Sequence, residues 1–378
     1  MLENNRILGS LVIRETSAAF ADLGTFLPLT VGLIVISGMS ATGLLFGFGM
    51  FALATAFMYR RPIPVQPMKA AAAAGIAGLA GPEVLIATGM MLGLTLVILS
   101  QTQAIGLLKR CIPNTVLYGM RLALAASLVA TAVGLQLPSG WGVITLLLVL
   151  IALQYTNFRN LSCFVVLVGG WIMFGSESAL VSWSIGWHLP ALELPPISAF
   201  WGALEVTYLP QLALTLTNAL ILTAVIAQDY FPDQKAQLTE QRFALSSGFA
   251  NVLLAPFGAM PMCHGAGGLA AYHGQGSTTG WSIAIFGVIC LVLALLFGND
   301  ATQVLTAIPM EVVVTLVLYA AWVLADPIKL SQLRPSCLCI ILLMVPVTLI
   351  SGLVTALAVG LMLEWLRLKR SGQASTGV

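Results

Sequence analysis

Long runs of apolar residues follow one another along almost the whole chain, and short stretches with glycine, proline or charge separate them. A helix that spans a bilayer needs about 20 such residues. Only 8% of the residues carry charge and 59% are hydrophobic, whereas a soluble protein of this size needs far more charge to cover its surface. The pattern predicts an all-α polytopic membrane protein. It excludes a soluble globule and a disordered chain, and the net charge of +2 excludes a nucleic-acid binder.

The runs are long enough for about 14 transmembrane helices. We expect seven in residues 1–180 and seven in residues 181–378, with no soluble domain and no cofactor. Movement of a solute would then draw on a gradient or on diffusion. The expected spans lie near residues 13–31, 40–58, 65–79, 83–101, 114–134, 141–156, 162–175, 204–228, 240–255, 261–272, 280–298, 302–323, 336–351 and 352–368.

The basic residues indicate the orientation of this layout. With 14 spans both termini lie on one side, and that side receives 14 of the 16 Lys and Arg residues. Basic loops stay on the cytoplasmic side, so both termini are expected in the cytoplasm. The membrane is expected to be the cell membrane, that is, an inner or plasma membrane. Lys69 and Arg121 are the exceptions, because they fall inside spans.

Three dipeptides recur in the same order in the two halves of the chain. They are Leu27-Pro28, Pro67-Met68 and Ile112-Pro113, followed by Leu209-Pro210, Pro261-Met262 and Ile308-Pro309. Seven spans separate the partners, and an odd number reverses the orientation in the membrane. This spacing predicts a seven-plus-seven inverted repeat, in which the substrate site lies near the midplane at interrupted helices.

The third and tenth spans are too short to cross the bilayer as plain helices, and each begins with proline-containing residues, 62–67 and 256–261. Irregular backbone at membrane depth survives where protein buries it or where it lines a watery cavity. A helix that begins there presents unpaired N–H groups and the positive end of its dipole. Two such starts facing each other favour an anion site.

In the first break we expect Gln66, Pro67, Met68 and Lys69 to bind the anion, with Pro67 at the first helical position. Lys69 would add a full positive charge, although it could instead extend to an interface or pair with Asp22 or Glu15.

In the second break the candidates are Pro261, Cys263, His264 and Gly265, with small residues that allow close approach to the backbone. His264 could donate to an oxyanion or be an ordinary core histidine. The cysteine and histidine spacing does not suggest a metal site.

Buried carboxylates are the usual carriers of coupled protons. Asp22 is the deepest candidate, and Glu15, seven residues earlier, is expected on the same helix face but could simply balance Arg14. Glu311 follows Pro309, where it could couple protons or favour a helix start. Asn218 belongs to a polar cluster in the eighth span and could line the same cavity or bond across helices.

The segments 64–70 (PVQPMKA) and 257–270 (FGAMPMCHGAGGLA) resemble the two signatures of the molybdate transporters related to the SulP sulfate carriers. Residues 22–29 (DLGTFLPL), 217–219 (TNA) and 229–232 (DYFP) are also similar, so the resemblance covers nearly the whole chain. It implies a 14-helix inverted-repeat fold shared with uracil permeases, divided into core and gate domains. It also implies uptake of a tetrahedral oxyanion, without the STAS domain of many SulP carriers.

One segment departs from the family pattern. Where the family continues with an aromatic, arginine-containing stretch, this chain reads YHGQGSTTG over residues 272–280. The departure bears on the substrate or on a cytoplasmic contact more than on the fold.

These features predict a secondary transporter that imports molybdate together with protons, rather than an enzyme. A sulfate transporter of the same fold, a nucleobase or other organic-anion symporter and an uncoupled anion channel remain alternatives. An intramembrane enzyme would need a nucleophile with a base, or a metal site. The expected partners are the oxyanion, the proton and the lipid bilayer, and the sequence leaves a homodimer open.

Overall fold

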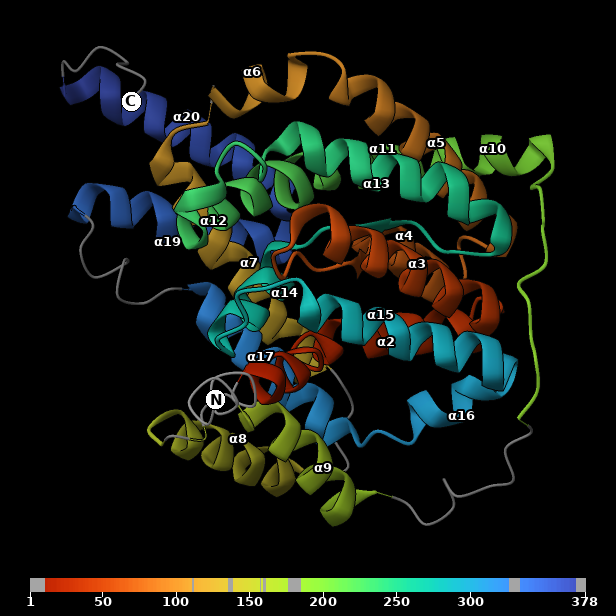
Figure 1. Ribbon diagram of the computed structural model, residues 1–378. Coiled ribbons are helices and arrows are strands. Elements are labelled where there is room, and N and C mark those ends of the chain that lie inside the picture. The colour runs from red at the N-terminus through yellow and green to blue at the C-terminus, as the bar shows by residue number, and fades with distance from the viewer. Residues whose placement is uncertain are drawn as a thin grey trace.

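Figure 1 shows the computed structural model of the chain, in which helices make up almost all of the regular structure. The structure describes residues 11–110, 112–134, 139–156, 158, 161–175, 185–325 and 334–371. The expected boundary between residues 180 and 181 lies outside these ranges, as do Arg6, Arg159, Glu177 and Lys329.

The first half contains eight named helices and one short strand. They are α2 (Leu23–Val35), α3 (Ala41–Tyr59), β1 (Gln66–Pro67), α4 (Lys69–Ile76), α5 (Pro82–Ser100), α6 (Ala104–Arg110), α7 (Asn114–Gly134), α8 (Gly140–Gln154) and α9 (Ser162–Phe174). Helix α6 was not expected, because the connection between the fourth and fifth spans contains charge and too few apolar residues for a span.

The second half is more irregular, with π-helical and 3₁₀ segments between its helices. Its first part comprises α10 (Ile197–Ala203), η3 (Leu204–Tyr208), α11 (Leu209–Leu214), η4 (Thr215–Leu222), α12 (Thr223–Tyr230), η5 (Pro232–Gln234), α13 (Glu240–Leu254), η6 (Ala255–Phe257) and β2 (Met262–Cys263). Its second part comprises α14 (Ala266–Gly274), α15 (Trp281–Val292), η7 (Leu293–Phe297), η8 (Gly298–Asp300), α16 (Ala301–Thr306), α17 (Met310–Ala325), α19 (Pro335–Ser351) and α20 (Leu353–Ser371).

Six helical stretches of the described chain are long and apolar enough to cross a membrane: 11–35, 41–59, 82–100, 114–134, 197–230 and 281–306. Four shorter apolar helices, α8, α9, α17 and α19, accompany them. Large apolar side chains such as Phe57, Trp141 and Ile172 are largely exposed, and a surface of this kind is stable against lipid rather than water. The chain is therefore a helical membrane protein.

Helices from the two halves pack against each other. Helix α13 lies along α5 and α15 lies along α3, while α17 and α19 both pack on α7. In Figure 1 helices α3 and α15 lie close together, and α8 and α9 lie at the far end of the molecule from α13 and α5. The two broken segments lie between these pairs, inside the protein.

Local sequence explains where several helices begin. Side chains of Ser40, Ser139 and Thr239 accept a hydrogen bond from the backbone N–H three residues later, at the starts of α3, α8 and α13. Pro82 and Pro335 occupy the first positions of α5 and α19, where a missing N–H costs no hydrogen bond.

The two breaks meet as a short antiparallel pair, β1 with β2, in which Gln66 lies opposite Cys263 and Pro67 opposite Met262. The N–H of Met68 donates to the Pro261 carbonyl over 2.9 Å. The flanking irregular backbone is buried, with Ile63 and Met260 both at 0% exposure. Protein burial of this extended backbone is the condition under which it is stable at membrane depth.

Two local expectations were wrong. Pro67 is not the first helical residue, because it belongs to β1 and α4 begins at Lys69. The first span is interrupted, because residues 19–22 form turns in which the N–H groups of Phe20 and Ala21 bond to carbonyls three residues back. Asp22 consequently stands at the N-cap of α2 rather than inside a helix.

Candidate functional site

A small cavity of about 10 Å³, with room for about one water molecule, lies where the two breaks meet the eighth span. The first break, the second break and the segment 211–219 all contribute to its wall. The lining residues are Gln66, Pro67, Lys69, Gln211, Leu214, Thr215, Asn218, Ala219, Cys263 and His264. The structure thus brings together six of the residues expected from the sequence and adds others from α11 and η4.

Lys69 is the first residue of α4 and lines this cavity. Among the described residues no carboxylate lies within 4.0 Å of its ammonium group, although the Asp22 carboxylate acts on it electrostatically from farther away. A half-buried cation with no close counter-ion, at the positive end of a helix, is a strong attractor for an anion.

Asn218 supplies a polar group without a partner. Its side chain is 6% exposed, and its Oδ1 atom has no hydrogen-bond partner in the described structure. Buried amide oxygens are nearly always hydrogen-bonded, so this amide has bonding capacity that the surrounding protein does not use. Asn218 lies in the π-helical segment η4, and such segments are frequent at functional sites.

Gln211 was missed by the sequence interpretation. Its Oε1 atom accepts hydrogen bonds from the backbone N–H groups of Ala70 (2.8 Å) and Ala71 (3.1 Å), in the first turn of α4. Its Nε2 donates to Thr215 Oγ1 over 2.9 Å. The spacing 211, 215, 218 is the signal that could have found it, because these positions share one helix face.

Asp22 and Gln66 form a cluster with Thr25 beside the cavity. Gln66 Nε2 donates to the two carboxylate oxygens of Asp22 over 2.8 and 2.6 Å and to Thr25 Oγ1 over 3.1 Å. The Thr25 hydroxyl also donates to Asp22 Oδ1. The side chain of Gln66 is therefore occupied by Asp22, and the two residues act as one unit.

Two glycines of the second break make room for this cluster. A Cβ atom at Gly265 would lie 1.6 Å from Gln66 Oε1, and one at Gly268 would lie 2.4 Å from Asp22 Oδ2. The glycine-rich run was expected to let a ligand approach the backbone. At these two positions the space is taken by side chains of the protein.

The ring of His264 is committed to the protein interior. Its Nδ1 lies 2.9 Å from the Pro64 carbonyl oxygen, and its Nε2 lies 2.8 Å from Ser246 Oγ. The rings of Phe51, Tyr59 and Phe243 surround it at centroid distances of 5.2, 5.7 and 5.0 Å. In this arrangement neither ring nitrogen is available to an anion, although the residue itself lines the cavity.

The other expected residues of the breaks hold the backbone. Met68 is fully buried, and Pro261 serves through its carbonyl. Asn251 of α13, which the sequence did not single out, bonds Met262 at both its N–H (2.8 Å) and its carbonyl (2.6 Å). These two hydrogen bonds from one amide side chain hold β2 in place.

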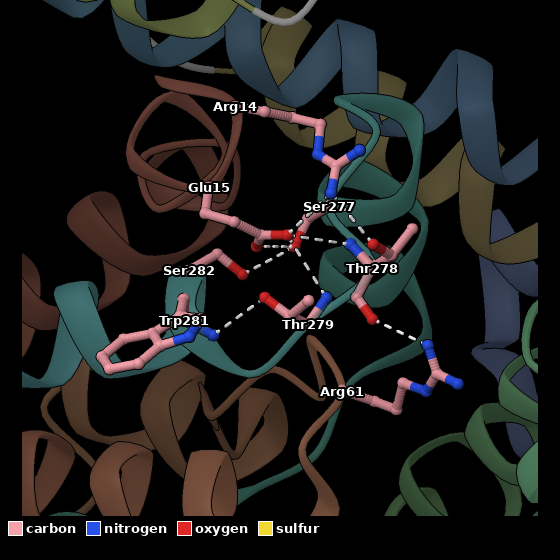
Figure 2. Close-up of polar contacts among 8 residues, drawn as sticks. All are labelled: Arg14, Glu15, Arg61, Ser277, Thr278, Thr279, Trp281 and Ser282. Atoms are coloured by element: carbon pink, nitrogen blue, oxygen red, sulfur yellow. Dashed lines mark hydrogen bonds and ion pairs between the residues drawn. The ribbon is translucent and has the colours of Figure 1, made fainter. Parts of the chain in front are cut away.

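Glu15 lies outside the cavity, at the loop that follows α14 (Figure 2), whereas Asp22 lies against Gly268 near the start of α14. Its buried carboxylate accepts hydrogen bonds from Ser277 Oγ (2.5 Å) and from the N–H groups of Thr278 (3.2 Å) and Thr279 (3.3 Å), with Arg14 3.4 Å away. The expectation that Glu15 and Asp22 act on one helix face was wrong, because the turns at 19–22 interrupt that face.

The same loop belongs to the arginine-poor stretch at residues 272–280, and two arginines from elsewhere in the chain reach it. Arg14 donates to the Thr278 hydroxyl over 3.1 Å, and Arg61 donates to the Thr278 carbonyl over 2.9 Å (Figure 2). Guanidinium groups from two other segments therefore reach this loop, which lies apart from the cavity.

Two further charged residues do not line the cavity. Glu311 lies in the first turn of α17, with its side chain against Gly142 of α8. Arg121 of α7 is 3% exposed and pairs with Asp229 over 3.9 Å. Within the described residues no group of three or more His, Cys, Asp or Glu side chains could hold a metal ion.

A larger cavity, of about 600 Å³, opens elsewhere beside Gly81 and Gly258. Two carboxylates, Glu83 and Glu193, line it, and no Lys or Arg does. Such a wall repels an anion. We therefore place the candidate site at the smaller cavity.

The chain is similar to known transporters over most of its length. The family model described as a molybdate transporter of the MFS superfamily matches residues 14–128 and 204–324, which include both breaks and the segment 211–219. Molybdate transporter 2 of Arabidopsis thaliana is 28% identical over 363 residues, covering 82% of this chain and 78% of the relative. Molybdate transporter 1 of Chlamydomonas reinhardtii is 26% identical and covers 83% of each chain.

Solved structures show the same fold. The transmembrane domain of the cyanobacterial bicarbonate transporter BicA aligns with a TM-score of 0.60 at 17% identity, covering 91% of this chain and 97% of that domain. SLC26A9 aligns with a TM-score of 0.61 at 11% identity, covering 96% of this chain, and the present chain spans 66% of its length. The segments matched by the family model, residues 14–128 and 204–324, make up more than half of the sequence. The chain therefore belongs to the molybdate transporter family.

Proposed function

We propose that this protein is a secondary active transporter that imports molybdate, and that the anion binds in the cavity between the two broken helices. The observation that carries the proposal is the conjunction of Lys69, at the start of α4, with the unpartnered Asn218 in one buried cavity. A cation, a helix dipole and an unpaired amide in a confined space suit a small oxyanion. The named relatives, which are molybdate transporters, favour molybdate over sulfate.

Binding would use the first break and the eighth span more than the second break. Lys69 supplies the charge, and Asn218 reorients its amide so that Nδ2 donates to the anion. Cys263 and His264 close the opposite wall. The buried ring of His264 contributes by holding Pro64 and Ser246 in place, rather than by contact with the substrate.

Proton coupling would run through Asp22. As a carboxylate it accepts the Gln66 amide and the Thr25 hydroxyl. A proton on Asp22 turns one acceptor into a donor, so Gln66 loses a partner and the first break changes its hydrogen bonding next to Lys69. Moving a dianion inward against a negative-inside potential costs roughly 2.3 kcal/mol per charge per 100 mV, and co-transported protons offset that cost.

The finer architecture belongs to the same proposal. We place 14 spans in a seven-plus-seven inverted repeat, residues 1–180 and 181–378, with both termini in the cytoplasm and the protein in the cell membrane. The pairing of β1 with β2, one break from each half, supports this arrangement. The orientation rests on the distribution of Lys and Arg.

Purified protein in liposomes tests the proposal. We expect uptake of labelled molybdate that increases when the outside is more acidic than the inside. Competition should rank tungstate close to molybdate, with sulfate weaker and phosphate and uracil ineffective. Uptake that ignores the pH gradient would indicate a channel, and inhibition by uracil alone would indicate a nucleobase carrier.

A further inference from the structure

The first turn of α4 is already occupied in this structure. Ala70 and Ala71 follow Lys69, and their N–H groups belong to those that have no partner within a helix. They are the groups that an anion at this helix start would use. Gln211 Oε1 accepts from both of them, at 2.8 and 3.1 Å.

Gln211 is held in that position from its other side. It is 1% exposed, and its Nε2 donates to Thr215 Oγ1 over 2.9 Å, one turn along the same span. The span is π-helical on both sides of α11, in η3 and η4. A side chain with both ends bonded, on a short α-helical stretch between two π-helical ones, has a defined resting position.

A second polar group in the cavity wall has no hydrogen-bond partner from Gln211 or from any other described residue. Asn218 Oδ1, two turns from Gln211 on the same face, is buried and unpartnered. Beside the cavity, the first N–H groups of α4 are therefore hydrogen-bonded by Gln211, whereas the Asn218 amide oxygen has no hydrogen-bond partner.

We propose that Gln211 is an internal substitute for the substrate: its amide oxygen occupies the α4 amides in the empty transporter, and the oxyanion displaces it. This proposal rests on the proposed oxyanion site. A charged oxygen forms stronger hydrogen bonds than an amide oxygen and also gains from the helix dipole and Lys69. An anion can therefore displace Gln211, whereas a neutral ligand offers no gain over it.

Gln211 would then set selectivity as well as affinity. Every ligand must compete with the same neutral amide, so weakly accepting or uncharged molecules fail even where they fit the cavity. Removing the competitor should tighten oxyanion binding and relax the rejection of neutral ligands. A purely structural role for Gln211 predicts the reverse, a looser α4 start and weaker binding.

The test measures binding of sodium molybdate to purified protein by isothermal titration calorimetry, with folding checked by thermal melting. We expect Gln211→Ala and the volume-preserving Gln211→Met to bind molybdate several-fold more tightly than the unmodified protein. Gln211→Glu places a tethered carboxylate on the α4 amides and should bind at least about tenfold more weakly, or roughly 1.4 kcal/mol. Gln228→Ala, on α12 away from the cavity, is the matched control and should not change affinity.

The outcomes separate this proposal from the proposed function. If the unmodified protein binds no oxyanion, the proposed site itself is wrong. If it binds molybdate, and the folded Gln211→Ala and Gln211→Met variants bind equally or more weakly, Gln211 is not a displaced substitute. Unchanged affinity in Gln211→Glu would overturn the proposal in the same way. Since the alanine variant could fail to fold, the methionine and glutamate variants suffice for the decision.

Discussion

The two broken helices differ in what they offer to a ligand. At the first break, Lys69 and the start of α4 face the cavity, and a side chain from another span satisfies the free amides. At the second break, side chains of the protein fill the space: Gln66 and Asp22 press against Gly265 and Gly268, and the His264 ring turns into the core. Breaks that look alike in sequence therefore serve different purposes.

The difference indicates that the two breaks have separate roles. The first break carries the charge that attracts the anion, whereas the second supplies a rigid wall and the surface on which Asp22 and Gln66 pack. Substitutions at the first break should change binding, and substitutions at the second should change stability. Four predictions test this contrast.

The largest effect is expected for Lys69→Ala. Removing a half-buried charge that faces a dianion should weaken molybdate binding by about 100-fold or more, which corresponds to roughly 2.7 kcal/mol. Lys69→Arg keeps the charge and should retain part of the affinity. Calorimetry on folded protein measures both variants, and unchanged affinity in Lys69→Ala would remove Lys69 from the site.

The next effect concerns coupling. Asp22→Asn keeps the shape of the side chain but removes the proton-binding group, so molybdate exchange across liposomes should persist while accumulation driven by a pH gradient disappears. Glu15→Gln is the control, because Glu15 bonds the loop at Ser277 and Thr279 and should leave pH-driven accumulation intact. Full accumulation in Asp22→Asn would show that another group carries the proton.

A stability effect is expected at the second break. Gly265→Ala puts a methyl group against Gln66 Oε1 and should lower the free energy of unfolding by about 1–3 kcal/mol, as overpacking commonly does. Gly267→Ala is the matched control, because its Cβ would come no nearer than 3.3 Å to Leu128. Thermal unfolding in detergent compares the two, and equal melting temperatures would contradict the packing that we describe.

The smallest effect on binding is expected for His264→Phe. The ring has no contact with the anion, so molybdate affinity should change by less than about threefold, or roughly 0.7 kcal/mol. Stability should fall by about 1–3 kcal/mol, because Ser246 loses one of its hydrogen bonds and the buried Pro64 carbonyl loses the bond from the ring. A large loss of affinity with normal stability would place the ring back in the binding site.

Much of the fold could be predicted from the sequence, because apolar length and proline act locally. Residues 62–67 and 256–261 marked the breaks correctly, since proline lacks an N–H and interrupts a helix wherever it stands inside one. The turn at residues 19–22 could not be foreseen. No proline or glycine marks it, and the packing of Asp22 against Gln66 and Gly268 accompanies it.

Site residues could be predicted where the chemical type of the side chain alone singles them out. They could not be predicted where the direction of the side chain in the fold determines its role. Lys69 and Asn218 stood out because polar groups are rare in an apolar span. Gln211 is a single amide after Pro210, and only the structure shows that it reaches α4. His264 looked functional beside the glycines, but its direction depends on Phe51, Tyr59 and Phe243, which lie far from it in the sequence.

The most direct test of the anion site uses the metal atom of the substrate itself. Crystals of the protein soaked with molybdate or tungstate give anomalous scattering that locates the anion without a model of the ligand. We expect one strong peak in the cavity between Lys69 and Asn218, with the Gln211 side chain moved away from Ala70 and Ala71. A peak in the larger cavity beside Glu83 and Glu193, with the smaller cavity empty, would contradict the account.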